Sequence, residues 1–345
     1  MRSALALLAF VSCLTLVAAS QSKPAATQAD VTKKIVAASQ ALLATLDESG
    51  RNKVQFAFES QQKSRWSNLP SPMFQREGLR LADLAPPQRT AAMAILSVAL
   101  SQDGYRKVTE IMHGDEVLRQ KGGGQGGPGG GGGGPIFGEN EYFLAFVGKP
   151  SETDRWMLQF GGHHLAINLT LAGNQATMAP SLPAAQPASY TVEGRTVRPL
   201  GNENDKAFAL INALDEKQRG QAILPSRVAD LVLGPGRDGR TIQPEGIRAS
   251  ALTTAQQTML WDVVREWVGI MNEAFSQPRM AELRANLKDT WFAWSGPTTN
   301  GSPAYFRVQG PTLVIEYAPQ GGSVDHIHTI YRDPTNDYGA KYASK

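Results

Sequence analysis

The order of helical and strand-like patterns is the feature that most restricts the fold of this 345-residue chain. Apolar residues recur at every third or fourth position in residues 31–46, which predicts an amphipathic helix that we expect Gly50 to end. Similar periods recur in residues 86–112 and 205–287. Segments rich in aromatic and branched residues, typical of strands, lie at 54–58, 141–147, 156–160 and 164–171. Because helices and strands come in blocks without regular alternation, the sequence predicts an α+β fold.

The C-terminal part of the chain predicts whether the sheet is parallel or antiparallel. Four short strand-like segments follow one another, with connections rich in Gly, Pro and Asn, at 291–294, 305–309, 313–317 and 326–331. Short connections between consecutive strands produce antiparallel pairing. We therefore expect a single large domain, residues 28–345, in which amphipathic helices flank an antiparallel sheet.

The first twenty residues have the pattern of a secretory signal peptide. Arg2 supplies the positive start, residues 4–17 are mostly apolar, and Val17-Ala18-Ala19 offers small residues for cleavage. The apolar run is shorter than the roughly 20 residues that span a bilayer, so we expect no membrane span after cleavage. Residues 21–27 then form a polar leader. The sequence thus predicts a secreted or periplasmic protein.

The single cysteine, Cys13, lies inside the predicted signal peptide. Val11-Ser12-Cys13 resembles a lipoprotein cleavage site, so lipid attachment stays open as the alternative. Against it, Phe10 stands where leucine is preferred, and the apolar run continues past the cysteine. Ordinary cleavage leaves a mature chain without thiols, which excludes disulfides and thiolate chemistry.

Charge and glycine patterns exclude nucleic acids and nucleotides as partners. The net charge is +3, and Lys and Arg are not gathered into a basic stripe. The glycine-rich stretch 122–134 does not lead into Gly-Lys-Ser/Thr and a helix, as a phosphate-binding loop does. With so few apolar side chains to offset the ordering entropy, this stretch is expected to be a loop.

Four of the five histidines form two close pairs, His163/His164 and His326/His328. Alternate side chains of a strand share a face, so His326 and His328 should project together. The same alternation gives His164 polar neighbours and His163 apolar ones, unless Gly161-Gly162 turns both. We predict that His164, His326 and His328 hold one divalent metal ion, with His163 as a weaker ligand candidate or a structural hydrogen-bond partner. Zinc suits such ligands first, and copper or iron are the redox alternatives.

Polar residues of the last strands complete the predicted site. If these strands pair in order, one sheet face carries Arg307 and Glu316 beside His326 and His328. Glu316 or Asp333 would then serve as fourth ligand or general base. Arg307 or Arg332 would steady an anionic group of the substrate. A sheet face this polar predicts the floor of a pocket.

Three blocks of the sequence resemble one known family. They are Phe160–Asn168 preceded by Gly148–Ser151, Tyr305–Pro311 followed by Ile315–Tyr317, and Asp325–Pro334 followed by Asn336–Gly339. The family is the one catalogued as domain of unknown function 3500. The resemblance implies one family domain over nearly all of the mature chain, with the glycine-rich stretch as an insertion, and it supplies no activity. Its motifs are centred on both histidine pairs, which favours a metal or catalytic site there.

Three functions stay open at this point. The first is a metal-dependent enzyme of the cell envelope, in which metal lowers the pKa of a bound water for hydrolysis. The second is a non-catalytic protein that binds a small molecule or an envelope polymer in the same polar pocket. In the third, the histidines only lock the sheet. A serine hydrolase is disfavoured because the chain has no Gly-x-Ser-x-Gly elbow.

Overall fold

The computed structural model describes residues 26–122 and 134–342. The predicted signal peptide, residues 1–20, lies outside the described residues, as do most of the polar leader and of the glycine-rich stretch. In the part of the chain that is described, no helix is both long and apolar enough to cross a membrane.

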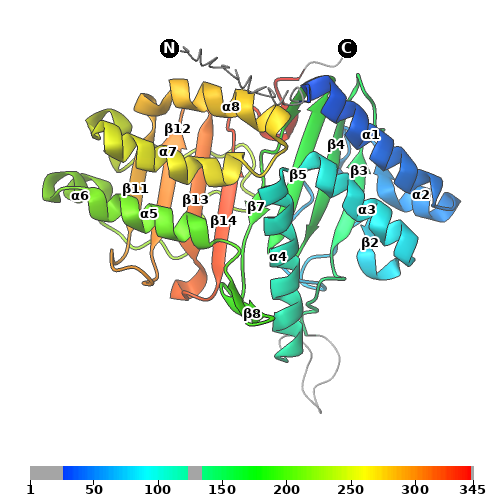
Figure 1. The fold of residues 1–345 in the computed structure, drawn as a ribbon, viewed down its shortest axis with the longest axis horizontal. Coiled ribbons are helices and arrows are strands. Elements are labelled where there is room, and N and C mark those ends of the chain that lie inside the picture. The colour runs from blue at the N-terminus through cyan, green and yellow to red at the C-terminus, as the bar shows by residue number, and fades with distance from the viewer. Residues whose placement is uncertain (1–25, 123–133, 343–345) are drawn as a thin grey trace, which may run out of the picture.

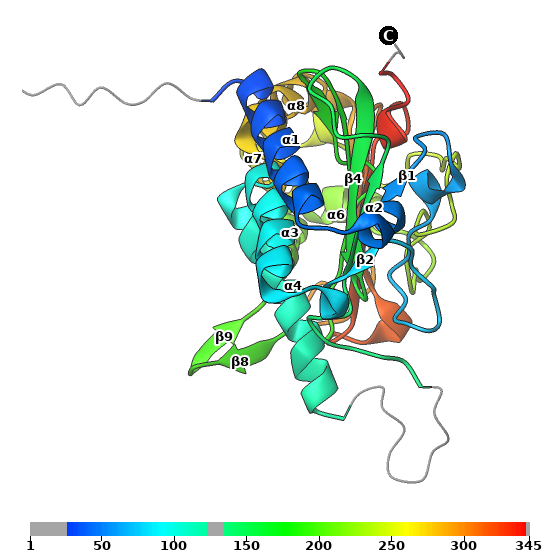
Figure 2. The same ribbon diagram turned by 90° about the vertical axis from the view of Figure 1, so that its right-hand side faces the viewer.

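Helices cover one face of the β-structure, and irregular loops cover the opposite face (Figures 1 and 2). The α-helices are α1 (Gln28–Ala44), α2 (Glu48–Val54), α3 (Pro86–Ala99), α4 (Gln102–Gln120), α5 (Gly201–Ala213), α6 (Glu216–Ala222), α7 (Thr254–Val268) and α8 (Glu273–Ala285). The first strands are β1 (Gln55–Phe56), β2 (Leu79–Arg80), β3 (Phe143–Val147), β4 (Arg155–Gly162), β5 (Leu165–Ala172), β6 (Gln175–Thr177), β7 (Leu182–Pro183), β8 (Tyr190–Val192) and β9 (Arg195–Val197). The later strands are β10 (Ile247–Arg248), β11 (Trp291–Ser295), β12 (Tyr305–Gly310), β13 (Leu313–Pro319) and β14 (Ile327–Arg332).

Capping side chains set the helix ends that the periodicity left undefined. α1 begins after Thr27, whose hydroxyl accepts a hydrogen bond from the backbone N of Asp30 at 3.1 Å. α3 begins with Pro86 in its first turn, where a missing N–H costs nothing. The expectation that Gly50 ends the first helix is wrong, because α1 ends at Ala44 and a separate helix, α2, contains Gly50.

The predicted antiparallel meander is confirmed. Strands β10 to β14 form a five-stranded sheet in chain order, and each pair is antiparallel. The second sheet has seven strands. Five follow the order β1-β3-β4-β5-β6, while β2 pairs with β3 and β7 pairs with β5. It is antiparallel except for one parallel pair, β1 with β3.

The segment Ser181–Ala185 joins the two sheets. Its central strand β7 pairs with β5 of the seven-stranded sheet. Its ends exchange hydrogen bonds with β14 of the other sheet: Ser181 with Tyr331 and Ala185 with Ile327, each N···O distance being 2.9 Å. The backbone hydrogen bonding thus continues from one sheet to the other, and the prediction of a single α+β domain is confirmed.

The two halves of the chain repeat one arrangement of elements. The order α1, α2, β1, β2, α3, α4 and a strand meander recurs as α5, α6, Ile223, β10, α7, α8 and a second meander. Ile223 forms a parallel bridge to Trp294, as β1 pairs in parallel with β3. Short sequences recur 168 positions apart: Leu46-Asp47-Glu48 with Leu214-Asp215-Glu216, and Glu77-Gly78-Leu79-Arg80 with Glu245-Gly246-Ile247-Arg248. The chain is therefore a tandem repeat of one structural unit.

Two glycines explain why the second of these sequences recurs. Gly78 and Gly246 have φ angles of +110° and +93°, a backbone conformation that residues other than glycine rarely adopt. A Cβ at Gly78 would lie 2.5 Å from the carbonyl O of Leu144, and one at Gly246 would lie 2.2 Å from that of Phe292. Each glycine lets its short strand approach the first strand of the meander in its own repeat.

Equivalent loops of the two repeats lie on the face opposite the helices, where they are blue and yellow-green in Figure 2. We call residues 57–78, between β1 and β2, the first inter-strand loop. Residues 224–246, between Ile223 and β10, are the second inter-strand loop. Both border the histidines described next.

Candidate metal centre

The two histidine pairs meet. One ring nitrogen from each of His164, His326 and His328 lies within 4.8 Å of the other two. The Nε2 of His326 is 2.8 Å from the Nε2 of His164 and 3.1 Å from that of His328. His164 belongs to the first repeat and the other two histidines to the second. The cluster therefore lies where the repeats join, next to the segment Ser181–Ala185.

His163 and His164 form the turn between β4 and β5. Gly162 and Leu165 pair across this hairpin, and His164 has a left-handed φ of +61°. The expectation that strand alternation places the two rings on opposite faces is therefore wrong. Both residues lie outside the strands, and their rings stack with centroids 3.6 Å apart. The turn falls just after Gly161-Gly162, close to the alternative that the sequence left open.

Backbone hydrogen bonds fix this turn to the first inter-strand loop. The backbone N of His164 donates to the carbonyl O of Asn68 at 3.1 Å. The Nη2 of Arg76 donates to the carbonyl oxygens of Ser67, Leu69 and Gly162, each at 2.7 Å. Burial lowers the pKa of Arg76 to about 10, so the guanidinium stays charged at neutral pH and its hydrogen bonds stay charge-assisted.

Asp230 determines which nitrogen of His328 faces the cluster. Its Oδ1 lies 2.9 Å from the Nδ1 of His328, so this nitrogen carries the proton and Nε2 presents a lone pair. The Nδ2 of Asn68 donates to the same Nε2 at 3.2 Å. Burial is the largest single effect on the pKa of Asp230 and raises it, but the interactions with His328, the backbone N–H of Leu231 and His326 together outweigh burial, so the pKa is lowered. A carboxylate behind a histidine in this way is the usual support of a metal ligand.

Burial keeps the other two histidines of the cluster, His164 and His326, neutral. Burial, and then the neighbouring histidines, lower the pKa of His164 well below its ordinary value. Burial lowers the pKa of His326 to about 4. At neutral pH both rings are therefore uncharged and each has one nitrogen with a free lone pair, which is the form that binds a metal.

The geometry of the three nitrogens fits a metal ion. A neutral ring nitrogen carries either one proton or one lone pair, so the Nε2 of His326 cannot form a good hydrogen bond with both neighbours at once. A cation between the three nitrogens would satisfy all of them. Tetrahedral zinc with bonds of about 2.0–2.1 Å would separate its nitrogen ligands by about 3.3 Å. The two shorter separations, 2.8 and 3.1 Å, are about 0.5 and 0.2 Å below that value.

His163 lies beside the cluster without belonging to it. Its Nδ1 is 2.6 Å from the Oδ1 of Asp115, and both side chains are buried. The other oxygen of Asp115 accepts a hydrogen bond from the backbone N of Gly138 at 2.8 Å. The ring of Phe137 covers His163 with centroids 4.7 Å apart. The structure thus gives His163 a structural hydrogen bond, the second of the two roles predicted for it.

Arg307 and Glu316 lie opposite one another on neighbouring strands, on the predicted sheet face. The Glu316 carboxylate accepts hydrogen bonds from the backbone N of Val232 and of Leu233, at 2.6 and 3.0 Å. Burial raises the pKa of Glu316, although these donors oppose the shift. Arg307 forms an ion pair with Glu245 at 2.8 Å. Both side chains therefore hold the second inter-strand loop on the sheet.

Arg332 and Asp333 also have partners away from the histidines. Arg332 pairs with Asp238 at 3.0 Å and with Asp337 at 2.7 Å. Asp333 lies 3.0 Å from Arg279 and lines a cavity of about 270 Å³. Among the described residues, the group of ligand atoms within 4.8 Å of one another includes neither carboxylate proposed as fourth ligand. The catalytic roles of these residues remain predictions.

Asp230, Asn68 and Asp115 support the histidines and were not foreseen from the sequence. Asp230 and Asn68 lie in the two inter-strand loops, where neither helical nor strand periodicity identifies a residue. The two loops have equivalent places in the two repeats, and that equivalence is the signal that could have drawn attention to both loops. Asp115 lies on α4, and only the tertiary contact with His163 distinguishes it from other helix residues.

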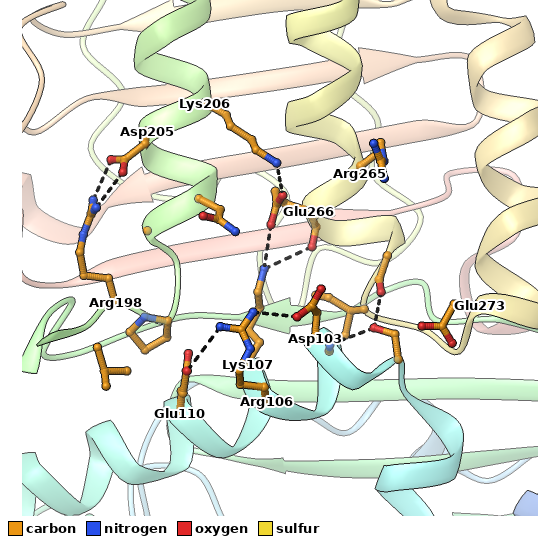
Figure 3. A pocket seen from close by; sticks show the side chains of 18 of the residues that line it. Asp103, Arg106, Lys107, Glu110, Arg198, Asp205, Lys206, Arg265, Glu266 and Glu273 are labelled. Atoms are coloured by element: carbon orange, nitrogen blue, oxygen red, sulfur yellow. Dashed lines mark hydrogen bonds and ion pairs between the residues drawn. The ribbon is translucent and has the colours of Figure 1, made fainter. Parts of the chain in front are cut away.

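A large cavity lies elsewhere. It has about 710 Å³ and is bounded by α4, α5 and α7 on the helical side of the molecule (Figure 3). Its walls carry charges of both signs, such as the ion pairs of Arg198 with Asp205 and of Lys206 with Glu266. None of the three clustered histidines lines it. We therefore place the candidate chemistry at the histidines and not in this cavity.

Comparison with known proteins gives one match. Neither the curated proteins nor the solved structures contain a significant relative of the chain. A family model described as "Protein of unknown function (DUF3500)" matches residues 28–340, which include both repeats and all three clustered histidines. The match extends from the first residue of α1 to beyond β14, and the chain therefore belongs to this family.

Proposed function

We propose that this protein binds one divalent metal ion, zinc in first place, through the Nε2 atoms of His164, His326 and His328, and that it acts as a metal-dependent hydrolase. The observation that carries the proposal is the convergence of three imidazole nitrogens, one of them on a ring oriented by a carboxylate. Three histidines with a fourth position for water are typical of catalytic zinc.

The proposed chemistry assigns a role to each supporting residue. A metal bound here would supply a water of lowered pKa as the nucleophile. Asp230 holds the proton on the far nitrogen of His328 and strengthens that ligand. His326 is only partly buried, whereas His164 and His328 are buried, so a substrate approaches from the side of His326.

Metal analysis tests the ligand set. Purified protein incubated with zinc and then desalted should retain about one ion per chain. The double variant His326→Ala/His328→Ala should retain none, because a single histidine binds zinc too weakly to survive desalting. His113→Ala is the matched control, since His113 is a half-exposed histidine of α4 outside the cluster. Wild-type protein without zinc, folded as before, would end the proposal.

A second candidate is a non-catalytic protein that binds a small molecule or an envelope polymer without metal. The polar walls of the 710 Å³ cavity favour it as the alternative. A chelator separates the two functions, because a ligand that binds only the folded state raises the melting temperature. Under the metal proposal EDTA lowers the melting temperature of the zinc-loaded protein by several degrees. An unchanged melting temperature supports the second candidate.

Export is part of the proposal and has its own test. The pattern in residues 1–20 predicts cleavage near Ala19 or Ser20. Expression of the full chain in a bacterial host, with mass spectrometry of the envelope and secreted fractions, should find a mature form that lacks this segment. An uncleaved chain in the cytoplasm contradicts export and leaves the metal proposal unaffected.

A further inference from the structure

We infer that the substrate of the proposed metal centre carries a neutral, apolar group, such as an alkyl chain, next to the bond that reacts. The inference rests on the proposed function and adds the class of substrate. The observation behind it is a set of exposed apolar side chains in the segments that contact the histidines, Leu69, Met73, Ile136 and Val232, which we call the rim.

The rim residues are unusual in their exposure. Large apolar side chains are normally buried, and a group of exposed ones marks a surface that binds something. Among the described residues, six large apolar side chains are exposed, and the rim contains four of them. Their exposed fractions are 40% for Leu69, 63% for Met73, 41% for Ile136 and 37% for Val232.

Backbone contacts place the first loop's part of the rim beside the cluster. Leu69 follows Asn68, whose side chain contacts His328 and whose carbonyl binds the backbone N of His164. Met73 lies two residues after Ser71, whose carbonyl O accepts a hydrogen bond from Ile136 at 2.6 Å.

The other two rim residues come from different segments. Ile136 precedes Phe137, whose ring covers His163. Val232 lies two residues after Asp230, the hydrogen-bond partner of His328. Three separate segments thus each contribute a contact to the histidine turn or cluster, polar from Asn68 and Asp230 and aromatic from Phe137, and at least one exposed apolar side chain.

The charges near the cluster argue against an anionic group in the substrate. Arg307 and Arg332 are only 3% and 2% exposed, and carboxylates of the protein already pair with them. The charged group that does face solvent beside the cluster is Asp230, with a side chain 47% exposed. A negative charge there repels an anion and leaves a neutral group unaffected. An apolar rim with one carboxylate therefore fits a neutral ester or amide with an alkyl or apolar acyl group.

Alkyl hydroxamates of increasing length test the inference, because their head group binds zinc and only the chain varies. Binding is measured by calorimetry on the zinc-loaded full chain, from acetohydroxamate to octanohydroxamate. A methylene group half-buried on an open rim should tighten the dissociation constant about 2-fold. The six added methylenes should then tighten it on the order of 50-fold. Equal affinities for both compounds overturn the inference and leave the metal centre standing, whereas protein that retains no zinc contradicts the proposed function itself.

A pair of variants shows where the chain binds. Leu69→Ser/Met73→Ser should reduce the difference in dissociation constant between the two hydroxamates to less than about 10-fold. The variant should retain zinc, since neither side chain is a ligand. Ile223→Ser is the matched control, because Ile223 is exposed to 37% and lies at the end of α6, beside the opposite edge of the five-stranded sheet. If octanohydroxamate binds the Leu69/Met73 variant more tightly than acetohydroxamate by the same factor as in wild type, the alkyl chain binds elsewhere. This result also rejects the rim as the binding surface.

Discussion

Single hydrogen bonds decide whether the histidine cluster can act as a set of ligands. Asp230 fixes the protonated nitrogen of His328, and Asn68 contacts the nitrogen that faces the cluster. Neither residue coordinates in our proposal. Both residues lie in the inter-strand loops, which reach the junction of the two repeats. The orientation of His328 therefore depends on residues that are far from it in sequence.

Replacement of Asp230 tests this support. Asp230→Asn keeps the size of the side chain and removes the charge that holds the proton on His328. We expect zinc affinity to fall by about 10–100-fold with little change in folding. Competition with a zinc-binding dye measures it.

Asp238→Asn is the control on the same loop. Asp238 pairs with Arg332 and accepts a hydrogen bond from Tyr338, so neither of these partners is a histidine of the cluster. Zinc affinity should stay within about 2-fold of wild type in this variant, because loss of a metal-site contact is what costs 10-fold or more. Equal losses in both variants contradict a specific role for Asp230.

At the scale of elements, the short strands β2 and β10 depend on a close approach that only glycine permits. The Cβ of a larger residue at Gly246 would lie 2.2 Å from the carbonyl O of Phe292. Because β10 ends the second inter-strand loop, the same glycine anchors the loop that carries Asp230. Loop position and metal support are thus linked through one backbone contact.

Two alanine variants separate close approach from backbone strain. Gly246→Ala combines a φ of +93° with the backbone collision, and we expect it to lower the free energy of unfolding by about 3 kcal/mol or more. Gly236→Ala has a φ of +74° and open space, so its cost should be about 1–2 kcal/mol. Urea unfolding of both variants measures the difference. Similar costs would mean that the collision relaxes and the close approach is not needed.

At the scale of the whole molecule, a buried ion pair joins the repeats on the helical side. Lys107 of α4 in the first repeat pairs with Glu203 of α5. Lys107 also lies 3.6 Å from Glu266 of α7 (Figure 3). Glu203 is fully buried, and burial raises its pKa, although Lys107 opposes the shift. The histidine cluster and this ion pair therefore join the repeats on opposite faces of the β-structure.

Removal of the lysine should destabilise the protein strongly. Lys107→Met leaves Glu203 as an uncompensated buried charge, and we expect a loss of about 3–5 kcal/mol at pH 7 in urea unfolding. Because the raised pKa means that the folded state binds the proton more tightly, the carboxyl is neutralised as pH falls, and the loss should be smaller at pH 5.

Two further variants test whether the buried charge causes the destabilisation. Lys206→Met is the control, because Lys206 pairs with Glu266 at the surface with a side chain 38% exposed, and its loss should stay below about 1 kcal/mol. Lys107→Met/Glu203→Leu should recover part of the stability, since no buried charge remains. A loss that is the same at both pH values would assign the effect to packing and not to charge.

Much of the fold was predictable because local patterns encode it. Apolar spacing located α1, α3, α4, α5, α7 and α8, and aromatic alternation located the strands of both meanders. The repeat, with an offset of 168 positions, is also visible in the sequence, as Leu46-Asp47-Glu48 and Leu214-Asp215-Glu216. It is missed when helices and strands are predicted one at a time. The site was predicted in part. The strand period placed His326 and His328 on one side, whereas His164 is in a turn, where that period does not hold.

The sequence by itself determined the α+β class, the antiparallel pairing of the last strands and the two histidine pairs, because each depends on residues close together in the chain. The tertiary structure alone decided that the pairs meet, since their approach depends on the segment Ser181–Ala185 between β5 and β14. It also decided that Glu316 and Arg307 hold a loop, whereas Asp230 supports a histidine. Contacts between residues 62 to 162 positions apart leave no periodic pattern in a single sequence. The contacts of Glu316, Arg307 and Asp230 form when the second repeat folds, whereas the approach of His164 to His326 forms only when the two repeats pack together.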